Sequence, residues 1–445
     1  METSLRLAPG TVPVAKNGLT RKVGLRVWLW LLTPGFLDQT PAARLRGWAR
    51  ALDWHEREGG RRGLLRRAAL RPILAWKEAG NAVEQHGGEV EEVSGVPRAR
   101  QHRQLWWLAV RHGLNAHSYR AYRLYLPERR RMAGRYAQER EFYRVMRWYN
   151  RQHADSDYRT MMDKELFQAW CAVNGLPHVP TLVTYDHGEL VFARVDGDPV
   201  ASLPAADLFQ KPADGTGGHG TERWSYVGSP REHLWRARDG RTLPASSLLA
   251  EMADLSASLP EKFGRLSRRM LLQPCLRNHA DLLPLTPGAL CTLRVVTVRE
   301  PGGRAQAILA AYKMARAGAV GDNTDLGGIS APMDLTTGVL GPGVGPRGAV
   351  RVTYEHHPDT GAEIAGREVP FWREAVALAI RGLDASNRLP SLGWDIAITD
   401  EGPVLLEGNP ASNPGIAQAP TGVPLSDTPL PRAIDAHMRQ LFGLA

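Results

Sequence analysis

Cysteine is scarce in this 445-residue sequence, which holds only Cys171, Cys275 and Cys291. Three thiols make no disulfide framework, and no Cys-x-x-Cys or Cys/His cluster indicates a zinc site. Long apolar runs are also lacking: the nearest candidate, residues 23–32, contains Arg26 and falls well short of the about 20 residues that span a membrane. We therefore expect a reducing, cytoplasmic location, a short helix at residues 23–32, and cysteines that act as small apolar side chains.

The net charge of +10 is unevenly distributed. Residues 1–150 hold 28 Lys and Arg against 13 Asp and Glu, whereas residues 151–445 hold 28 against 33. Eight of the 13 tryptophans also lie in residues 1–150. Arginine beside tryptophan suits a helical layer with Trp inside and Arg reaching outward, or an anionic membrane surface. We expect several helices here and leave open a peripheral position at the inner membrane face, with nucleic acid as the less favoured partner.

Hydrophobic periodicity changes near residue 150. Before it the pattern is helical, whereas after it short apolar runs typical of strands alternate with helical patterns. The predicted strands cover residues 181–185, 190–194, 290–299, 304–313, 396–399 and 404–407. The predicted helices cover residues 163–175, 248–259, 370–385 and 431–441. Strands mixed with helices predict an α+β fold preceded by a helical N-terminal region.

The stretch GWDIAITDEGPVLLEGN, residues 393–409, carries the most chemical information. It predicts a β-hairpin in which Asp395 begins one strand and lies opposite Glu407 near the end of the next. Asn409 lies two residues further on, on the same face as Glu407. Two carboxylates and a carboxamide form a hard-oxygen donor set that suits Mg²⁺. The alternative is a surface hairpin with ordinary polar ends, although a carboxylate that ends an apolar strand needs a partner.

A second motif, DLFQKPADGTGGHG at residues 207–220, places Lys211 at the end of a short apolar strand. A glycine-rich loop follows, containing Gly215, Gly217, Gly218 and Gly220. Glycine permits close backbone approach, and successive N–H groups can cradle phosphate. The lysine precedes the glycines, so this is not a P-loop. Flexibility alone explains such a loop equally well, and it becomes a candidate nucleotide site only together with the hairpin.

Two further apolar strands contain polar residues. Arg294 lies within CTLRVVTV, and a buried guanidinium needs an anionic partner, either a transferring phosphate or a salt bridge inside the sheet. MLLQPCL ends in Gln273 and Pro274, a junction whose backbone can hydrogen-bond to an adenine edge. The Gly-rich segment that contains Asp322 and Asn323 lines an acceptor site or forms a structural turn.

The order of these motifs resembles the ATP-grasp family over roughly residues 115–440. Lys164 in MMDKELF comes first, followed by the elements described above, which end in Asp395 and Glu407-x-Asn409. The phrases LLQPCLRNHADL, TLRVVTV, GDNTDLGGISAPMDLTTG and HPDTG look like the sugar-transfer associated group of that family. The resemblance implies two α+β subdomains that hold ATP between them. We accordingly divide the chain into a basic helical region, 1–115, and an ATP-grasp domain, 116–445, with a helical lead-in at 116–160.

The resemblance also implies roles for individual residues. Lys164 and Lys211 would contact the ATP phosphates beneath a lid formed by residues 215–220, and Arg294 would steady the transferred phosphoryl group. Two Mg²⁺ ions are implied, one held by Asp395 and Glu407 and the other by Glu407 and Asn409. His279 and Asp281 are the candidates for a ribose contact. Catalysis of this kind needs positioning and charge neutralisation, and no protein nucleophile.

The function that follows from the resemblance is an ATP- and Mg²⁺-dependent ligase. A small-molecule carboxylate would become an acyl phosphate for attack by an amine or similar nucleophile, in a context such as cell-surface sugar or peptide-like metabolite biosynthesis. One alternative is a phosphotransferase with a stable phosphorylated product. Another is a membrane-surface or nucleic-acid-binding protein with a vestigial ATP site, against which the intact set of charged motifs argues. The sequence does not identify the substrates or the oligomeric state.

Overall fold

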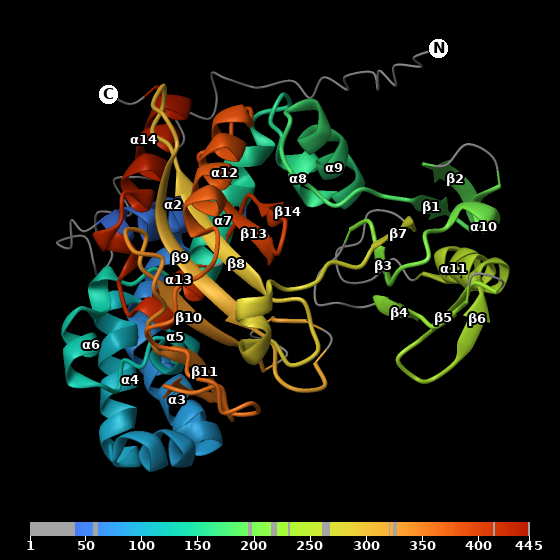
Figure 1. The fold of residues 1–445 in the computed structure, drawn as a ribbon. Coiled ribbons are helices and arrows are strands. Elements are labelled where there is room, and N and C mark those ends of the chain that lie inside the picture. The colour runs from blue at the N-terminus through green and yellow to red at the C-terminus, as the bar shows by residue number, and fades with distance from the viewer. Residues whose placement is uncertain are drawn as a thin grey trace.

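The computed structural model describes residues 41–56, 61–194, 198–214, 220–229, 232–259, 268–319, 321–323, 327–412 and 414–443. The helix expected at residues 23–32 and the loop glycines Gly215, Gly217 and Gly218 lie outside this part. Within it, an N-terminal helical region precedes two antiparallel sheets (Figure 1), which confirms the predicted α+β class. None of the described helices combines the length and apolar content needed to cross a membrane.

The N-terminal region is helical throughout its described part. Its elements are α2 (Pro41–Glu56), α3 (Arg61–Ser94), α4 (Arg98–His112), α5 (Ala116–Ala121), α6 (Pro127–Arg131), η1 (Ala133–Arg135) and α7 (Glu139–Arg151). Helix α3 ends because Gly95 adopts a φ of +67°, a conformation that glycine accepts without strain. Tyr119, Tyr122 and Tyr125 follow on α5 and the turn after it, and all three are buried among the helices.

A smaller sheet follows in the chain, after α8 (Tyr158–Met162) and α9 (Lys164–Val173). Its spatial order is β2 (Glu189–Ala193), β1 (Val183–Asp186), β7 (Met270–Pro274), β3 (Leu208–Pro212), β4 (Glu222–Tyr226), β5 (Leu234–Arg236) and β6 (Thr242–Pro244). Helix α11 (Ala245–Ser258) packs on this sheet, and the short α10 (Pro199–Ser202) contacts α11. The buried indoles of Trp224 and Trp235 fill the core between the sheet and α11.

The larger sheet has the order β12 (Val350–Tyr354), β11 (Gly343–Arg347), β10 (Ile329–Met333), β9 (Gln306–Met314), β8 (Thr292–Val298), β13 (Ser391–Thr399) and β14 (Gly402–Asn409). The remaining elements are η2 (Ala280–Leu285), α12 (Trp372–Ala385), α13 (Pro414–Thr421), η4 (Leu425–Asp427) and α14 (Leu430–Phe442). Every residue of β8 and β13 is buried. These two central strands are therefore covered on both faces.

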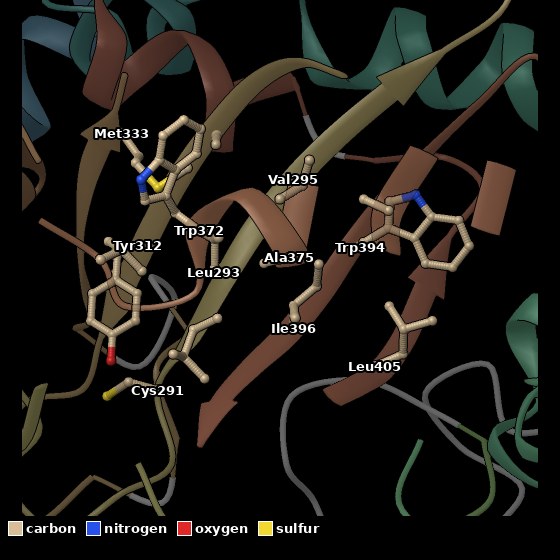
Figure 2. Close-up of a cluster of buried hydrophobic side chains, with 14 of the residues drawn as sticks. Cys291, Leu293, Val295, Tyr312, Met333, Trp372, Ala375, Trp394, Ile396 and Leu405 are labelled. Carbon is tan, nitrogen blue, oxygen red and sulfur yellow. The ribbon is translucent and has the colours of Figure 1, made fainter. Parts of the chain in front are cut away.

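One face of the larger sheet packs against α12 (Figure 2). Alternate residues of the strands point into this core, including Leu293, Val295, Tyr312, Trp394 and Ile396. Helix α12 lies close because Gly382 has no side chain: a Cβ there would come within 2.6 Å of the Trp394 ring. Cys291 lies in the same core and Cys171 is buried nearby, as expected of cysteines that act as small apolar side chains, whereas Cys275 is only half-buried.

The opposite face of the larger sheet packs against helices at one end and borders a cleft at the other. At one end, Val296 and Val298 of β8 pack against α2, α7 and α14. At the other end, Thr292 and Arg294 of the same strand line a cleft. Side chains alternate along a strand, so Thr292, Arg294, Val296 and Val298 point to the opposite face from Leu293 and Val295. Helices α2, α7 and α14 therefore cover one end of this face and leave the other end to the cleft.

Candidate active site

A cleft of about 960 Å³ lies between residues of the two sheets. Most of the candidate residues from the sequence line it together, although they are up to 245 positions apart. The lining residues among them are Lys164, Lys211, Gln273, Pro274, Arg294, Asp395, Glu407 and Asn409. Gly220, which has a φ of +77°, does not line the cleft, although the adjacent Thr221 does. The phosphate role of the rest of that loop lies outside the described residues.

The hairpin of β13 and β14 has the register that the sequence predicts. Asp395 pairs with Glu407, and Gly393 pairs with Asn409. The register shifts between Asp395 and Ile396, which partners Leu405, so Leu406 is an extra residue on β14. This bulge brings Glu407 opposite Asp395, and the Asn409 amide nitrogen donates to the Glu407 carboxylate at 3.3 Å.

Glycines beside these residues are required by close packing. A Cβ on Gly393 would lie 2.3 Å from the Ser412 hydroxyl oxygen. A Cβ on Gly408, between Glu407 and Asn409, would lie 2.8 Å from the Met161 sulfur. Neighbouring chain segments therefore approach the hairpin more closely than any side chain permits, which fixes the positions of its polar groups.

A buried ion network lies beside the hairpin. Arg294 donates from Nε and Nη2 to the two oxygens of Asp395, each at 2.8 Å, and its Nη1 reaches the Ser412 hydroxyl at 3.4 Å. The Lys313 ammonium lies 3.0 Å from Asp395 and 3.4 Å from Asp322. Thr292 donates to Asp322. The structure thus gives Arg294 the salt bridge inside the sheet that the sequence left open as the alternative to a phosphate.

The charges of this network reinforce one another. Burial alone would raise the pKa of Asp395, but Arg294 and Lys313 hold it well below its usual range. Burial likewise opposes the charged form of Arg294, yet the Asp395 carboxylate raises its pKa above the ordinary value. Burial raises the pKa of Asp322, which Lys313 partly offsets. Asp395 and Arg294 are therefore charged at neutral pH, as a close pair in a dry environment requires.

Lys313 is a site residue that the sequence analysis missed. Its strand, QAILAAYKM, is apolar up to the lysine, so the argument that singled out Arg294 applies to it as well. The register of β8 and β9 places Lys313 opposite Thr292, two residues from Arg294 and on the same face. Asp322, which the sequence left between an acceptor site and a structural turn, lines the cleft and contacts Lys313.

The two lysines come from the other side of the cleft. Lys164 is the first residue of α9, whose start is capped by the Asp163 carboxylate accepting from the Glu165 and Leu166 amides. The Lys164 amide also donates to the Ala213 carbonyl at 2.8 Å, which joins α9 to the end of β3. Burial and, to a lesser extent, the nearby Lys164 lower the pKa of the Lys211 ammonium to about 7, although Glu407 opposes the shift. Two ammonium groups so close favour binding of a polyanion.

We predict that ATP binding at pH 8 takes up close to one proton. Lys211 with a pKa of about 7 is mostly neutral at that pH, and a triphosphate beside it favours the charged form. Titration calorimetry in buffers of different ionisation enthalpy measures the uptake. The Lys211→Arg variant, which is charged throughout, should bind without it. A wild-type protein that binds with no proton uptake would contradict this prediction.

The residues expected to contact adenine line the cleft, whereas those expected to contact the ribose do not. The Gln273 side chain turns inward and donates to the Val179 carbonyl and the Thr181 hydroxyl, each at 3.4 Å, so any adenine contact there falls to the main chain. Pro274 lines the cleft. His279 and Asp281 are not among its lining residues: the His279 ring accepts from the Asp281 amide at 3.1 Å and begins η2. A ribose role for these two residues stays a prediction that this geometry does not favour.

The donor set fits Mg²⁺ by its chemistry. Within the described residues, no group of three or more His, Cys, Asp and Glu side chains is arranged to hold a metal on its own. Glu407 and Asn409 present hard oxygens to the cleft, while both Asp395 oxygens already accept from cations. Magnesium characteristically takes one or two protein carboxylates and completes its shell with water and phosphate oxygens. The residues therefore fit an ion that binds together with a nucleotide.

The cleft thus lies between two antiparallel sheets, with Lys164 and Lys211 on one side and the hairpin carboxylates on the other, an arrangement that fits an ATP-grasp protein. The sugar-transfer associated ATP-grasp family matches residues 143–428. The chain belongs to this family, which confirms the resemblance drawn from the motifs. No curated protein matches the sequence.

Similar solved structures are distant in sequence. The ADP complex of N5-carboxyaminoimidazole ribonucleotide synthetase is 12% identical with a TM-score of 0.34, over 68% of this chain and 58% of that one. An L-amino acid ligase from Bacillus licheniformis is 10% identical with a TM-score of 0.31, over 62% and 48%. D-alanine–D-alanine ligase from Bacillus anthracis is 13% identical with a TM-score of 0.28, over 63% of each chain. This chain spans less than two thirds of the length of each.

Proposed function

We propose that the protein is an ATP- and Mg²⁺-dependent ligase that activates a small-molecule carboxylate for attack by an amine or similar nucleophile. One observation carries the proposal: Lys164 and Lys211 line the same cleft as Asp395, Glu407 and Asn409. Membership of the ATP-grasp family supports it. Cations on one side and metal-binding oxygens on the other are what a nucleotide triphosphate with its metal requires.

In the proposed reaction, a carboxylate oxygen attacks the γ-phosphorus and the bond to the ADP oxygen breaks. The amine then attacks the acyl carbon, inorganic phosphate leaves, and the ammonium proton is released to solvent. Lys164 and Lys211 bind and orient the triphosphate, which lowers the charge repulsion that an anionic acceptor meets. Glu407 and Asn409, with Asp395 beside them, would hold Mg²⁺, which neutralises phosphate charge when bound.

The acceptor site is proposed among the cleft residues that come from the N-terminal helices and from β12, the edge strand of the larger sheet. These elements carry neither the two lysines nor the hairpin carboxylates. The proposed acceptor residues include His117 of α5, Glu139 and Tyr143 of α7, and Arg351 of β12. A guanidinium is suited to a carboxylate because its N–H groups match two oxygens at once. We therefore assign Arg351 to the acceptor carboxylate.

The Arg351→Ala variant is expected to raise KM for the acceptor by about tenfold or more, because it removes a charge-assisted hydrogen bond. The Kd for ATP should stay unchanged, since Arg351 belongs to β12 of the larger sheet, whereas the two lysines belong to α9 and to β3 of the smaller sheet. Steady-state kinetics with varied acceptor and nucleotide binding by calorimetry separate the two effects. A change in ATP affinity without a change in acceptor KM would contradict the assignment.

A screen for ADP release across candidate carboxylates and amines tests the proposed function. A ligase releases ADP and inorganic phosphate only when both substrates are present, and mass spectrometry finds a condensed product. A stable phosphorylated product without condensation would instead identify a phosphotransferase. Absence of nucleotide binding by calorimetry would identify a vestigial site and reject both reactions.

A further inference from the structure

We propose that the surface formed by α3, α4 and α6 docks on an anionic lipid bilayer. This surface lies on the helical side of the molecule, away from the small sheet (Figure 1). It is independent of the proposed ligase reaction. We call it the α3–α4 face and define it by Leu70, Ile73, Leu74, Trp76, Lys77, Arg100, Arg103, Trp106, Trp107, Arg130 and Arg131.

The first observation is an exposed apolar stripe on α3. Ile73 is 67% exposed, Leu74 is 51% exposed, and Leu70 precedes them by one helical turn. The buried face of the same helix is marked by Ala75 and Ala79. Helical spacing puts the aliphatic side chains opposite these alanines, so they point away from the protein. A cluster of large exposed aliphatic residues on one helix marks an interaction surface.

The second observation is a groove of about 840 Å³ where α3 meets α4. Its walls contain three tryptophans, of which Trp76 is 49% exposed and Trp107 is 45% exposed. Trp76 stays in place because it packs against Trp106 and against the His102 ring. Half-exposed indoles suit the bilayer interface, where one edge of the ring meets lipid and the other meets water.

The third observation is the charge of this groove. Four arginines line it, Arg100, Arg103, Arg130 and Arg131, and no acidic residue does so within the described part of the chain. Arg130 also donates to the Leu124 and Tyr125 carbonyls, whereas Arg100 and Arg103 are exposed on the outer face of α4. A basic surface around exposed tryptophans is complementary to anionic headgroups over an apolar layer.

The exposed aliphatic residues of α3 distinguish between a nucleic acid and an anionic bilayer as the partner of this face. A nucleic acid offers phosphates to the arginines and bases to the tryptophans, but it offers nothing to Ile73 and Leu74. A bilayer accommodates all three kinds of side chain at once, at successive depths. The face therefore fits a lipid surface better than a nucleic acid.

Flotation of the full chain with vesicles tests this proposal. The protein should float with vesicles of equal parts phosphatidylcholine and phosphatidylglycerol, and much less with phosphatidylcholine alone. The Arg100→Gln/Arg103→Gln variant should lose about fivefold in partitioning per arginine, or about 30-fold for the pair. The Ile73→Glu/Leu74→Glu variant should lose at least about tenfold, because it removes apolar burial and adds repulsion.

Matched controls come from other exposed positions. Arg381→Gln/Arg432→Gln removes two exposed arginines from α12 and α14 and should leave partitioning unchanged. Val173→Glu changes an apolar residue of α9 that is 87% exposed, and it should float like the wild type. Circular dichroism confirms that each variant is folded, and ATP binding should be the same in all of them.

Four outcomes would overturn the proposal. They are failure of the wild type to float, equal flotation with neutral vesicles, full flotation of both patch variants, and a wild-type dimer that Ile73→Glu/Leu74→Glu dissociates. The last result would assign the face to a second copy of the chain. Loss of flotation together with unchanged ATP binding supports the proposal, and ATP binding reports on the proposed ligase separately.

Discussion

Replacing Glu407 with alanine is expected to reduce ADP formation by about 10³-fold or more. Glu407 is the carboxylate of the hairpin whose oxygens are not already held by a guanidinium, and it lines the cleft beside Asn409. Removing one group that neutralises charge in the transition state costs about 10²–10³ in rate, and loss of the metal adds to this. A coupled assay for ADP, run with the substrates found in the screen, measures the effect.

The Glu401→Ala variant is the matched control. Glu401 lies in the turn of the same hairpin and is exposed, so its loss should leave ADP formation at the wild-type rate. Thermal unfolding of both variants establishes that the fold is retained. Wild-type activity in Glu407→Ala would reject the proposed metal site, because no neighbouring side chain replaces both its charge and its position.

Replacing Arg294 with methionine is expected to lower the free energy of unfolding by about 3–5 kcal/mol, the typical cost of breaking a buried ion pair. The variant would leave Asp395 buried with Lys313 as its remaining close cation. Because the pKa of Asp395 lies well below that of an unfolded Asp, the wild type progressively loses this stabilisation as the pH falls from about 4 towards the folded-state pKa. In the variant the pKa of Asp395 rises towards the unfolded value, so acidification over the same range costs less stability than it does in the wild type. Urea unfolding at several pH values measures both effects.

The surface pair of Arg316 and Asp359 provides the control. It has the same two-bond geometry, with both distances at 2.7 Å, but it is far more exposed to solvent. Arg316→Met should therefore cost only about 0–1 kcal/mol. A double-mutant cycle with Asp395→Asn gives the coupling between Arg294 and Asp395 directly. If Arg294→Met and Arg316→Met lower the free energy of unfolding equally, burial does not increase the contribution of the Arg294–Asp395 pair to stability.

The sequence predicted the site best where the chemistry is local. The hairpin needed only two apolar strands, a turn and the alternation of side chains, and Asp395 and Glu407 pair as expected. Lys313 was missed because its importance depends on β9 lying beside β8, a pairing that no local pattern specifies. The inward turn of the Gln273 side chain also depends on partners almost 100 residues away.

Strands of the fold were predicted where the sequence contains an apolar run. Strands β8, β9, β13 and β14 all overlap predicted runs, although the runs at residues 396–399 and 404–407 cover only about half of β13 and of β14, whereas β10, β11 and β12 were not predicted. Strand β11 reads GVGPR, and its two glycines and proline are residues that strands usually avoid. A Cβ on Gly343 would lie 2.7 Å from the Ile329 side chain, so tertiary packing explains what propensity does not.

The sequence also did not predict which tryptophans of the N-terminal region are buried and which are exposed. Composition predicted a helical region, but it gave no means of separating core residues from surface ones. Trp48 stacks on Phe442, with ring centres 5.3 Å apart, and donates to Asp435 at 2.8 Å. Trp76 and Trp107 stay half exposed in a very similar local context. The difference arises because α14, near the C-terminus, packs against α2, the helix that carries Trp48.

Helices α5 and α7 line the cleft beside strands that follow them by more than a hundred residues. Two separate stretches of sequence thus line one cavity. In the proposed acceptor site, substitutions in the helical stretch would change which substrates the cavity admits and leave the hairpin and the lysines as they are. The proposed arrangement therefore separates the residues that select the substrate from those that bind ATP.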